Sequence, residues 1–230
     1  MLERVCEVRD LGVILDSKLT FSAHISQTIC KANRALGTLI RSFQTGLPST
    51  KFHKKTLLAT YFANVRSILE YGCVIWGGAA RSHTDRLERI QHKFLIWLVS
   101  RARNVTVQSL GYRELLRTFD VPSLEARRLQ YDIMFLRNVH GGDVDSPYLA
   151  ECFPLRVPSR TTRNLCLFHV PYARVNTVKF GMFCRLPMKV NEFLQKCSMV
   201  DVFTFSAFCF KSQVKRHVKP SDDRERLRDR

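Results

Sequence analysis

The stretch from Ser82 to Arg103 constrains the fold most, because it has the pattern of one long amphipathic helix. Leu87, Ile90 and Phe94 recur at steps of three and four residues, which predicts one apolar helical face. Cations at the same steps predict a basic stripe along a second face: Arg86, Arg89 and Lys93. Such a helix needs a core on one side, while its basic side faces either solvent or a polyanion.

The start of this helix has the spacing of a capping box. Ser82 is followed three residues later by Asp85, so both side chains are expected to bond the first free backbone N–H groups. Asp85 and Glu88 also lie in the first turns, where the helix dipole favours negative charge. We therefore expect the helix to begin at Ser82.

The charge of the chain points to a polyanionic partner. Lys and Arg number 37 against 20 Asp and Glu, which gives a net charge of +17; nucleic acid is the usual partner of so basic a protein. An anionic membrane surface is the alternative, but the sequence has no apolar run of membrane-spanning length. The first residues also lack the apolar core of a signal peptide. We expect no membrane partner and an intracellular location, in the nucleus, the cytoplasm or both, without secretion.

The first hundred residues predict a short strand and three helices. Residues 9–16 have the pattern of one apolar strand, 21–43 of a helix, and about 50–70 of a second helix capped by Ser49 or Thr50. With the helix from Ser82, these helices are expected to share one core that contains Ile25, Leu36, Leu58, Tyr61, Ile90 and Phe94.

The cations are unevenly distributed along the chain. No acidic residue lies between Asp16 and Glu70, where eight cations occur: Lys18, Lys31, Arg34, Arg41, Lys51, Lys54, Lys55 and Arg66. Solvated helices usually alternate in sign, so the imbalance favours polyanion binding over a plain solvated face.

The second half predicts helices followed by irregular structure. A short helix is expected over 112–119 and a longer one from Ser123 to the Gly141-Gly142 pair, with Arg127 and Arg128 in its second turn. From residue 146 onward prolines recur, so long helices are not expected. A second acid-free span covers 152–191, with interleaved aromatics: Phe168, Tyr172, Phe180 and Phe183. These aromatics predict either base stacking or a small core with a basic rim.

No catalytic or metal site is evident in the sequence. Two-metal polymerases hold carboxylates on a rigid element, whereas the only acidic doublet, Asp222-Asp223, lies in a polar, charged tail. None of the eight cysteines forms a Cys-x-x-Cys pair; the nearest approach to a zinc pair is Cys166-Leu-Phe-His169. Buried free thiols are the expected state of the cysteines.

Several segments, in the same order along the chain, resemble reverse transcriptases of non-LTR (LINE-type, jockey-like) retrotransposons. Val8-Arg-Asp-Leu-Gly-Val-Ile-Leu-Asp-Ser-Lys-Leu-Thr-Phe-Ser-Ala-His-Ile25 is similar to the segment that follows the catalytic palm. Ile68-Leu-Glu-Tyr-Gly-Cys-Val-Ile-Trp-Gly77 and Leu87-Glu-Arg-Ile-Gln-His-Lys-Phe-Leu95 resemble the motifs after it. The family's C-terminal region is resembled by Leu124-Glu-Ala-Arg-Arg128, Pro158-Ser-Arg-Thr-Thr-Arg163 and Val170-Pro-Tyr-Ala-Arg-Val-Asn176.

The resemblance implies part of an RNA-directed DNA polymerase with a mainly α fold. It implies a remnant of the palm edge at 1–20, a thumb-like helical bundle at 21–103, and a C-terminal region at 104–210 that is helical and then irregular. Residues 211–230 are expected to form a disordered charged tail. The palm aspartates are expected upstream of Met1, so this fragment would need no cofactor, while Mg²⁺ would serve the full-length polymerase.

The implied role is to hold template–primer duplex of RNA and DNA, with the upstream palm and fingers as further partners. One alternative is a freestanding nucleic-acid-binding protein derived from such an element, and another is a decayed gene fragment without a stable fold. No catalytic or metal-binding residue is predicted. The predicted nucleic-acid contacts are Lys31, Arg34, Arg41, Lys51, Lys54, Lys55, Arg66, Arg86, Arg89, Lys93, Arg127, Arg128, Arg160, Arg163 and Arg174.

Overall fold

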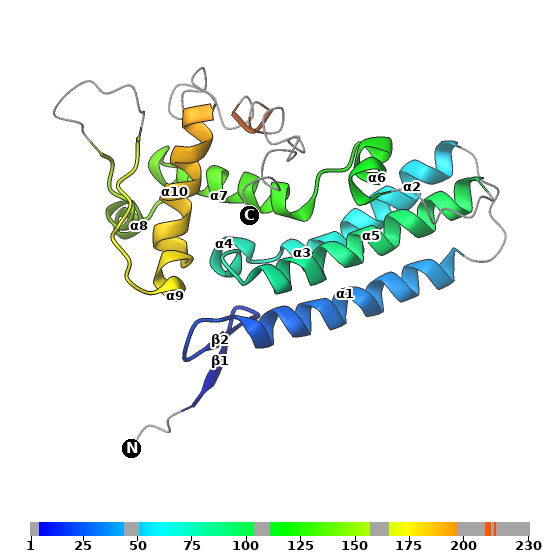
Figure 1. Cartoon of the computed structure of the whole chain (residues 1–230), viewed down its shortest axis with the longest axis horizontal. Helices are drawn as coiled ribbons and strands as arrows, with labels where there is room; N and C mark the ends of the chain where they lie inside the picture. The colour runs from blue at the N-terminus through cyan, green and yellow to red at the C-terminus, as the bar shows by residue number, and fades with distance from the viewer. Residues whose placement is uncertain are drawn as a thin grey trace, which may run out of the picture. The chain divides into compact units, whose positions relative to one another are not determined.

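The chain folds into two compact units (Figure 1). The computed structural model describes residues 5–43, 51–103, 111–156, 166–196, 210–212 and 214, without the side chains of 51–53, 102 and 103. Unit 1 comprises Met1–Cys73 and Ala79–Glu125, and unit 2 comprises Val74–Gly78 and Ala126–Arg230. The domain ranges inferred from the sequence remain predictions, and most of the expected tail at 211–230 lies outside the described residues.

Unit 1 begins with a β-hairpin, where the sequence predicted a single strand over 9–16. Strands β1 (Glu7–Asp10) and β2 (Val13–Asp16) pair antiparallel, with Glu7 opposite Asp16 and Asp10 opposite Val13. Leu11 and Gly12 join them with φ values of 43° and 86°, the positive pair that a two-residue type I′ turn requires. The single-strand prediction was wrong because it placed this Leu-Gly turn inside the strand.

Helix α1 (Ser22–Ser42) follows the hairpin and agrees with the expected helix over 21–43. The next helical run is interrupted by a π-helical turn: α2 (Lys51–Tyr61), η1 (Phe62–Arg66) and α3 (Ser67–Glu70). Its buried residues step by four: Leu57, Tyr61, Val65 and Leu69. Since an α-turn holds 3.6 residues, steps of four drift around the helix, and the wider π-turn reduces this drift. The prediction placed Leu58 in the core, but Leu58 is half-buried and its neighbour Leu57 is buried instead.

Helix α5 (Arg81–Arg103) completes the three-helix core after the short α4 (Cys73–Trp76). Tyr61 stacks on Phe94 with ring centroids 4.1 Å apart, and Ile25, Leu36 and Ile90 are buried as predicted. The predicted capping box is wrong. Ser82 lies inside the helix, and the first helical N–H groups bond the carbonyl of Ala80 instead.

Unit 1 ends with α6 (Tyr112–Phe119), which has the predicted bounds. Helix α7 (Leu124–His140) begins at the end of unit 1 and runs into unit 2, where α8 (Pro147–Cys152), α9 (Asn176–Lys179) and α10 (Met182–Lys196) follow. The core of unit 2 gathers residues from α7 and α10 with Phe153 and Phe168 between them in sequence.

The 15-residue helix α10 contradicts the expectation of irregular structure after residue 146. It contains Pro187, which cannot donate the usual helical hydrogen bond to Phe183. Pro187 and the neighbouring Leu186, Val190 and Phe193 are buried in unit 2. Tertiary packing therefore overrides the local cost of the proline. The described chain is mainly α, as predicted, with one small antiparallel sheet.

Candidate nucleic-acid interface

Helix α1 presents an exposed basic face opposite its core face. Lys31, Arg34 and Arg41 are exposed, and Ile25, Ile29, Ala32, Leu36 and Leu39 are buried. The helix contains no acidic residue, and within the described chain none of the three cations is within ion-pair distance of a carboxylate. On this face the Thr38 hydroxyl accepts a hydrogen bond of 3.4 Å from the Arg41 guanidinium.

Helix α5 carries a similar stripe. Arg86, Arg89 and Lys93 are exposed on a face beside that of the buried Leu87, Ile90 and Phe94, and no ion pair holds them within the described part of the chain. Asp85 is the one exposed carboxylate of the helix. We call the α1 and α5 sets together the unit 1 stripes.

The unit 1 stripes extend along the bundle. Helices α1 and α5 contact one another and run in the same direction (Figure 1). The Ser22 hydroxyl lies 3.2 Å from His83 Nε2, which places the beginnings of the two helices level. With a rise of 1.5 Å per residue, Arg86 and Arg41 mark positions about 24 Å apart along the bundle, roughly the length of seven base pairs.

The second carboxylate of α5, Glu88, is bound internally. Its Oε1 accepts the Glu125 backbone N–H at 2.7 Å and its Oε2 accepts the Leu124 N–H at 3.3 Å, so it caps the beginning of α7. The Tyr112 hydroxyl also donates to it. Burial and the charge of Glu88 raise the pKa of Tyr112. Glu88 therefore stabilises unit 1 and does not neutralise the stripe.

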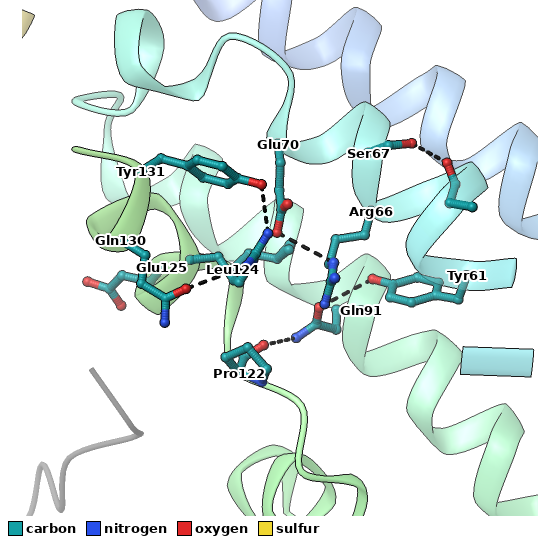
Figure 2. A network of polar contacts seen from close by, with 12 residues as sticks. Tyr61, Arg66, Ser67, Glu70, Gln91, Pro122, Leu124, Glu125, Gln130 and Tyr131 are labelled. Carbon is teal, nitrogen blue, oxygen red and sulfur yellow. Dashed lines mark hydrogen bonds and ion pairs between the residues drawn. The ribbon is translucent and has the colours of Figure 1, made fainter. Parts of the chain in front are cut away.

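Gln91 continues this polar network in the core (Figure 2). Its Oε1 accepts a bond of 3.4 Å from the Tyr61 hydroxyl, while its amide donates to the Pro122 carbonyl at 3.0 Å and to the Tyr112 hydroxyl at 3.1 Å. Burial also raises the pKa of Tyr61. Thus Glu88 and Gln91 attach the 112–125 segment to α5. Sequence reasoning placed both residues in a family motif but assigned them no partners.

The hairpin is attached to α1 by two polar residues. The Asp16 carboxylate accepts the backbone N–H groups of Lys18, Thr20 and Phe21 at 3.0, 3.0 and 2.7 Å. Burial alone would raise the pKa of Asp16, but these hydrogen bonds hold it below its usual value. His24 Nδ1 accepts the Ile14 N–H at 3.4 Å, and burial together with the charge of Lys31 lowers the pKa of His24.

Several predicted contact residues have other partners. Arg66 pairs with Glu70 at 3.6 Å and lies 3.6 Å from the Phe62 ring centroid. Arg127 donates to the Tyr131 hydroxyl at 2.7 Å. Arg128 is 5% exposed and is therefore too buried to contact a phosphate backbone.

The remaining predicted cations differ in their exposure, and some lie outside the described residues. Lys55 and Arg174 are exposed and Lys54 is half-buried. Lys51 begins α2 but its side chain is not described, and Arg160 and Arg163 lie outside the described residues. The full set of predicted contacts stays a prediction.

A buried ion pair in unit 2 was not foreseen. Arg185 of α10 donates to Asp132 of α7 and to the Val74 carbonyl, and both members of the pair are buried. Burial raises the pKa of the Asp132 carboxyl to about 7, while the Arg185 and Arg128 guanidiniums act against that rise. No local sequence signal links two residues 53 positions apart. Arg185 lies in the acid-free span of 152–191 and still has a carboxylate partner.

The described residues offer no obvious metal site. Among them, no group of three or more His, Cys, Asp or Glu side chains lies together. Their six cysteines are free, and Cys6 and Cys30 are exposed, contrary to the expected burial. No described helix is long and apolar enough to cross a membrane.

Comparison with known proteins finds a partial similarity. Over 83 residues, 36% of its length, the chain is 32% identical to "Probable RNA-directed DNA polymerase from transposon X-element" of Drosophila melanogaster. The matched region spans 9% of that polymerase. No family model and no solved structure matches the chain. The similarity supports a relationship between this region and retrotransposon reverse transcriptases.

Proposed function

We propose that unit 1 holds nucleic-acid duplex through the backbone phosphates, as the template–primer-binding part of a retrotransposon RNA-directed DNA polymerase. The polymerase similarity supports the reaction class, and the resemblance noted in the sequence supports a thumb-like role. In this proposal the Mg²⁺-binding carboxylates of the polymerase lie outside the described residues.

The unit 1 stripes are the observation that carries the proposal. Six exposed cations lie on two contacting helices without ion-pair partners among the described residues: Lys31, Arg34, Arg41, Arg86, Arg89 and Lys93. When such cations neutralise backbone phosphates, they release the counterions condensed on the nucleic acid, and this release favours binding. Contacts to phosphates position a duplex without reading its sequence.

The salt dependence of binding tests the proposal. Each neutralised phosphate adds about 0.9 to the slope of log K against log salt on duplex DNA, so four contacts give a slope beyond roughly −3.5. The full chain is titrated with a labelled duplex of about 15 base pairs, twice the length that the stripes span. We expect native and scrambled duplexes to bind within a few-fold of each other, because base recognition is not needed.

A triple variant localises the contacts. In Lys31→Gln/Arg34→Gln/Arg41→Gln the slope of log K against log salt should become shallower by about 2 to 3, while the circular dichroism spectrum stays unchanged. The matched control Arg113→Gln/Arg156→Gln/Lys211→Gln removes three exposed cations outside the stripes and should change the slope much less than the triple variant does.

Two outcomes would contradict the proposal. Equal loss in the triple variant and its control would mean that net charge, and not the stripe, governs binding. Preference for one sequence by orders of magnitude would favour the freestanding regulator.

A further inference from the structure

We propose that residues 170–183 of unit 2 bind single-stranded nucleic acid by stacking unpaired bases on exposed aromatic rings. This segment, which we call the aromatic segment, shares no residue with the unit 1 stripes. The proposal therefore stands or falls separately from duplex binding.

The aromatic segment exposes an unusual amount of apolar surface. Tyr172 is 87% exposed, Phe180 46% and Phe183 49%. Val175 and Val178 between them are also more than half exposed. Phe168, which the sequence grouped with these rings, is buried in the core of unit 2 and is not available for stacking.

Contacts within unit 2 hold the aromatic segment in place. Phe168 lies just before the segment, and its backbone exchanges two hydrogen bonds with the buried Asn191 side chain of α10, at 3.0 and 2.8 Å. Phe183 near its end stacks on Phe153 with centroids 5.6 Å apart, which fixes one ring face while the side chain stays half exposed. The Phe183 ring is thus held in place before a base stacks on it, which lowers the entropy lost on stacking.

A close backbone approach adds a further attachment. A Cβ at Gly78 would lie 1.7 Å from the Phe180 carbonyl oxygen, so only glycine allows this part of the segment to lie against the turn that follows α4. The backbone N–H of Phe180 donates to Asn176 at 2.9 Å, and that of Arg185 donates to Gly181 at 2.9 Å. Phe180 is therefore placed by main-chain contacts on both sides.

The charge of the segment selects an anionic ligand. Arg174 and Lys179 are exposed between the rings, and no acidic residue occurs from 152 to 191. Single-strand binders combine such cations, which contact phosphates, with rings on which successive bases stack. A duplex would meet only the cations, because its bases are already stacked on one another.

An anionic membrane is the competing ligand for an aromatic and basic surface. Surface helices that enter lipid bury a long apolar face. Here Tyr172 and Phe180 lie outside any helix, since α9 has only four residues and α10 begins at Met182. Phe183 lies in the first turn of α10, whose apolar face is already buried in the core of unit 2. The geometry therefore favours separate stacking positions over a membrane-inserting face.

The test uses the full chain and two single substitutions, Tyr172→Leu and Phe180→Leu, which remove a ring but keep apolar volume. The probe is labelled oligothymidylate of about 15 nucleotides, titrated at several salt concentrations. Each substitution should weaken binding about tenfold without changing the salt slope, since no charge is lost. Arg174→Gln should instead make the salt slope shallower by about 0.7. Binding of duplex should be unchanged in both ring variants.

The control is Tyr148→Leu on α8, which removes an exposed tyrosine outside the segment. It should bind oligothymidylate as the parent does. Parental binding by Tyr172→Leu, or an equal loss in Tyr148→Leu, would overturn the proposal. So would binding to phosphatidylserine vesicles that depends on Tyr172 while oligothymidylate binding does not.

Discussion

The arginines of unit 1 and unit 2 look alike in the sequence but differ in their surroundings. On α1 and α5, Arg34 and Arg89 are exposed and have no carboxylate partner among the described residues. On α7 and α10, Arg128 and Arg185 are buried near one carboxylate, Asp132. The first kind is available to a ligand, whereas the second kind stabilises the core of unit 2.

The difference shows what an acid-free span in a sequence does and does not imply. The span from 17 to 69 contains α1, and the exposed cations of α1 have no ion-pair partner within the described chain. The span from 152 to 191 contains Arg185, whose carboxylate comes from α7. A lack of nearby acids in sequence therefore indicates an anion-binding surface only when the cations are also exposed.

Removing a buried arginine of unit 2 should have the largest effect on stability. Arg185→Gln leaves the buried Asp132 carboxylate without its ion-pair partner and removes a donor to the Val74 carbonyl, so unfolding free energy should fall by about 3–5 kcal/mol. The measurement is denaturant unfolding at neutral pH. Arg34→Gln on the α1 stripe is the matched comparison and should change stability by less than about 0.5 kcal/mol. Similar losses in both variants would abolish the distinction between the two kinds of arginine.

Within unit 1, buried polar side chains should matter more than the exposed cations. Gln91→Leu leaves the Pro122 carbonyl without its amide donor, so stability should fall by about 1–3 kcal/mol while the salt slope of duplex binding stays constant. Gln195→Leu replaces an exposed glutamine of α10 and serves as the control. A changed slope with parental stability would mean that Gln91 belongs to the binding surface.

Periodicity predicted the helices well because burial of one face dominates their formation. The bounds of α1, α6 and α7 and the burial of Ile90 and Phe94 follow from spacing alone. Spacing did not predict the hairpin turn, the π-turn or the proline within α10, because each depends on partners distant in sequence or on positive φ values.

The candidate site was predictable only in part. The Lys31/Arg34/Arg41 and Arg86/Arg89/Lys93 spacings located exposed faces, since a helical period also reports which side is polar. The same reasoning could not see that Glu88 caps α7 or that Arg128 is buried. Those outcomes depend on which helices meet, and spacing within one helix does not contain that information.

A substitution in the turn before α1 should have a smaller effect on stability. Asp16→Ala removes the acceptor of three backbone N–H groups and should cost about 1–2 kcal/mol at neutral pH. Since the folded pKa of Asp16 is lowered, this contribution is present above the unfolded value near 3.8 and is lost as the pH falls through the folded pKa. Parent and variant should therefore converge in stability as the pH falls below 3.8 and through the folded pKa. A constant difference down to pH 2 would show that the ionised carboxylate is not the acceptor that matters.

His24 should give the smallest effect, in a different pH range. Its folded pKa is lowered, so the unfolded chain binds a proton more readily and stability is lost as the pH falls below about 6.5. A proton on Nδ1 would also remove the acceptor of the Ile14 N–H, so acid should loosen the hairpin from α1. His24→Asn keeps an acceptor at a similar position but does not titrate. The parent should lose stability relative to this variant between pH 7.5 and about 5.5, and exchange of the Ile14 amide should rise only in the parent. Parallel pH profiles would mean that His24 stays neutral for another reason and that the hairpin is held mainly by Asp16.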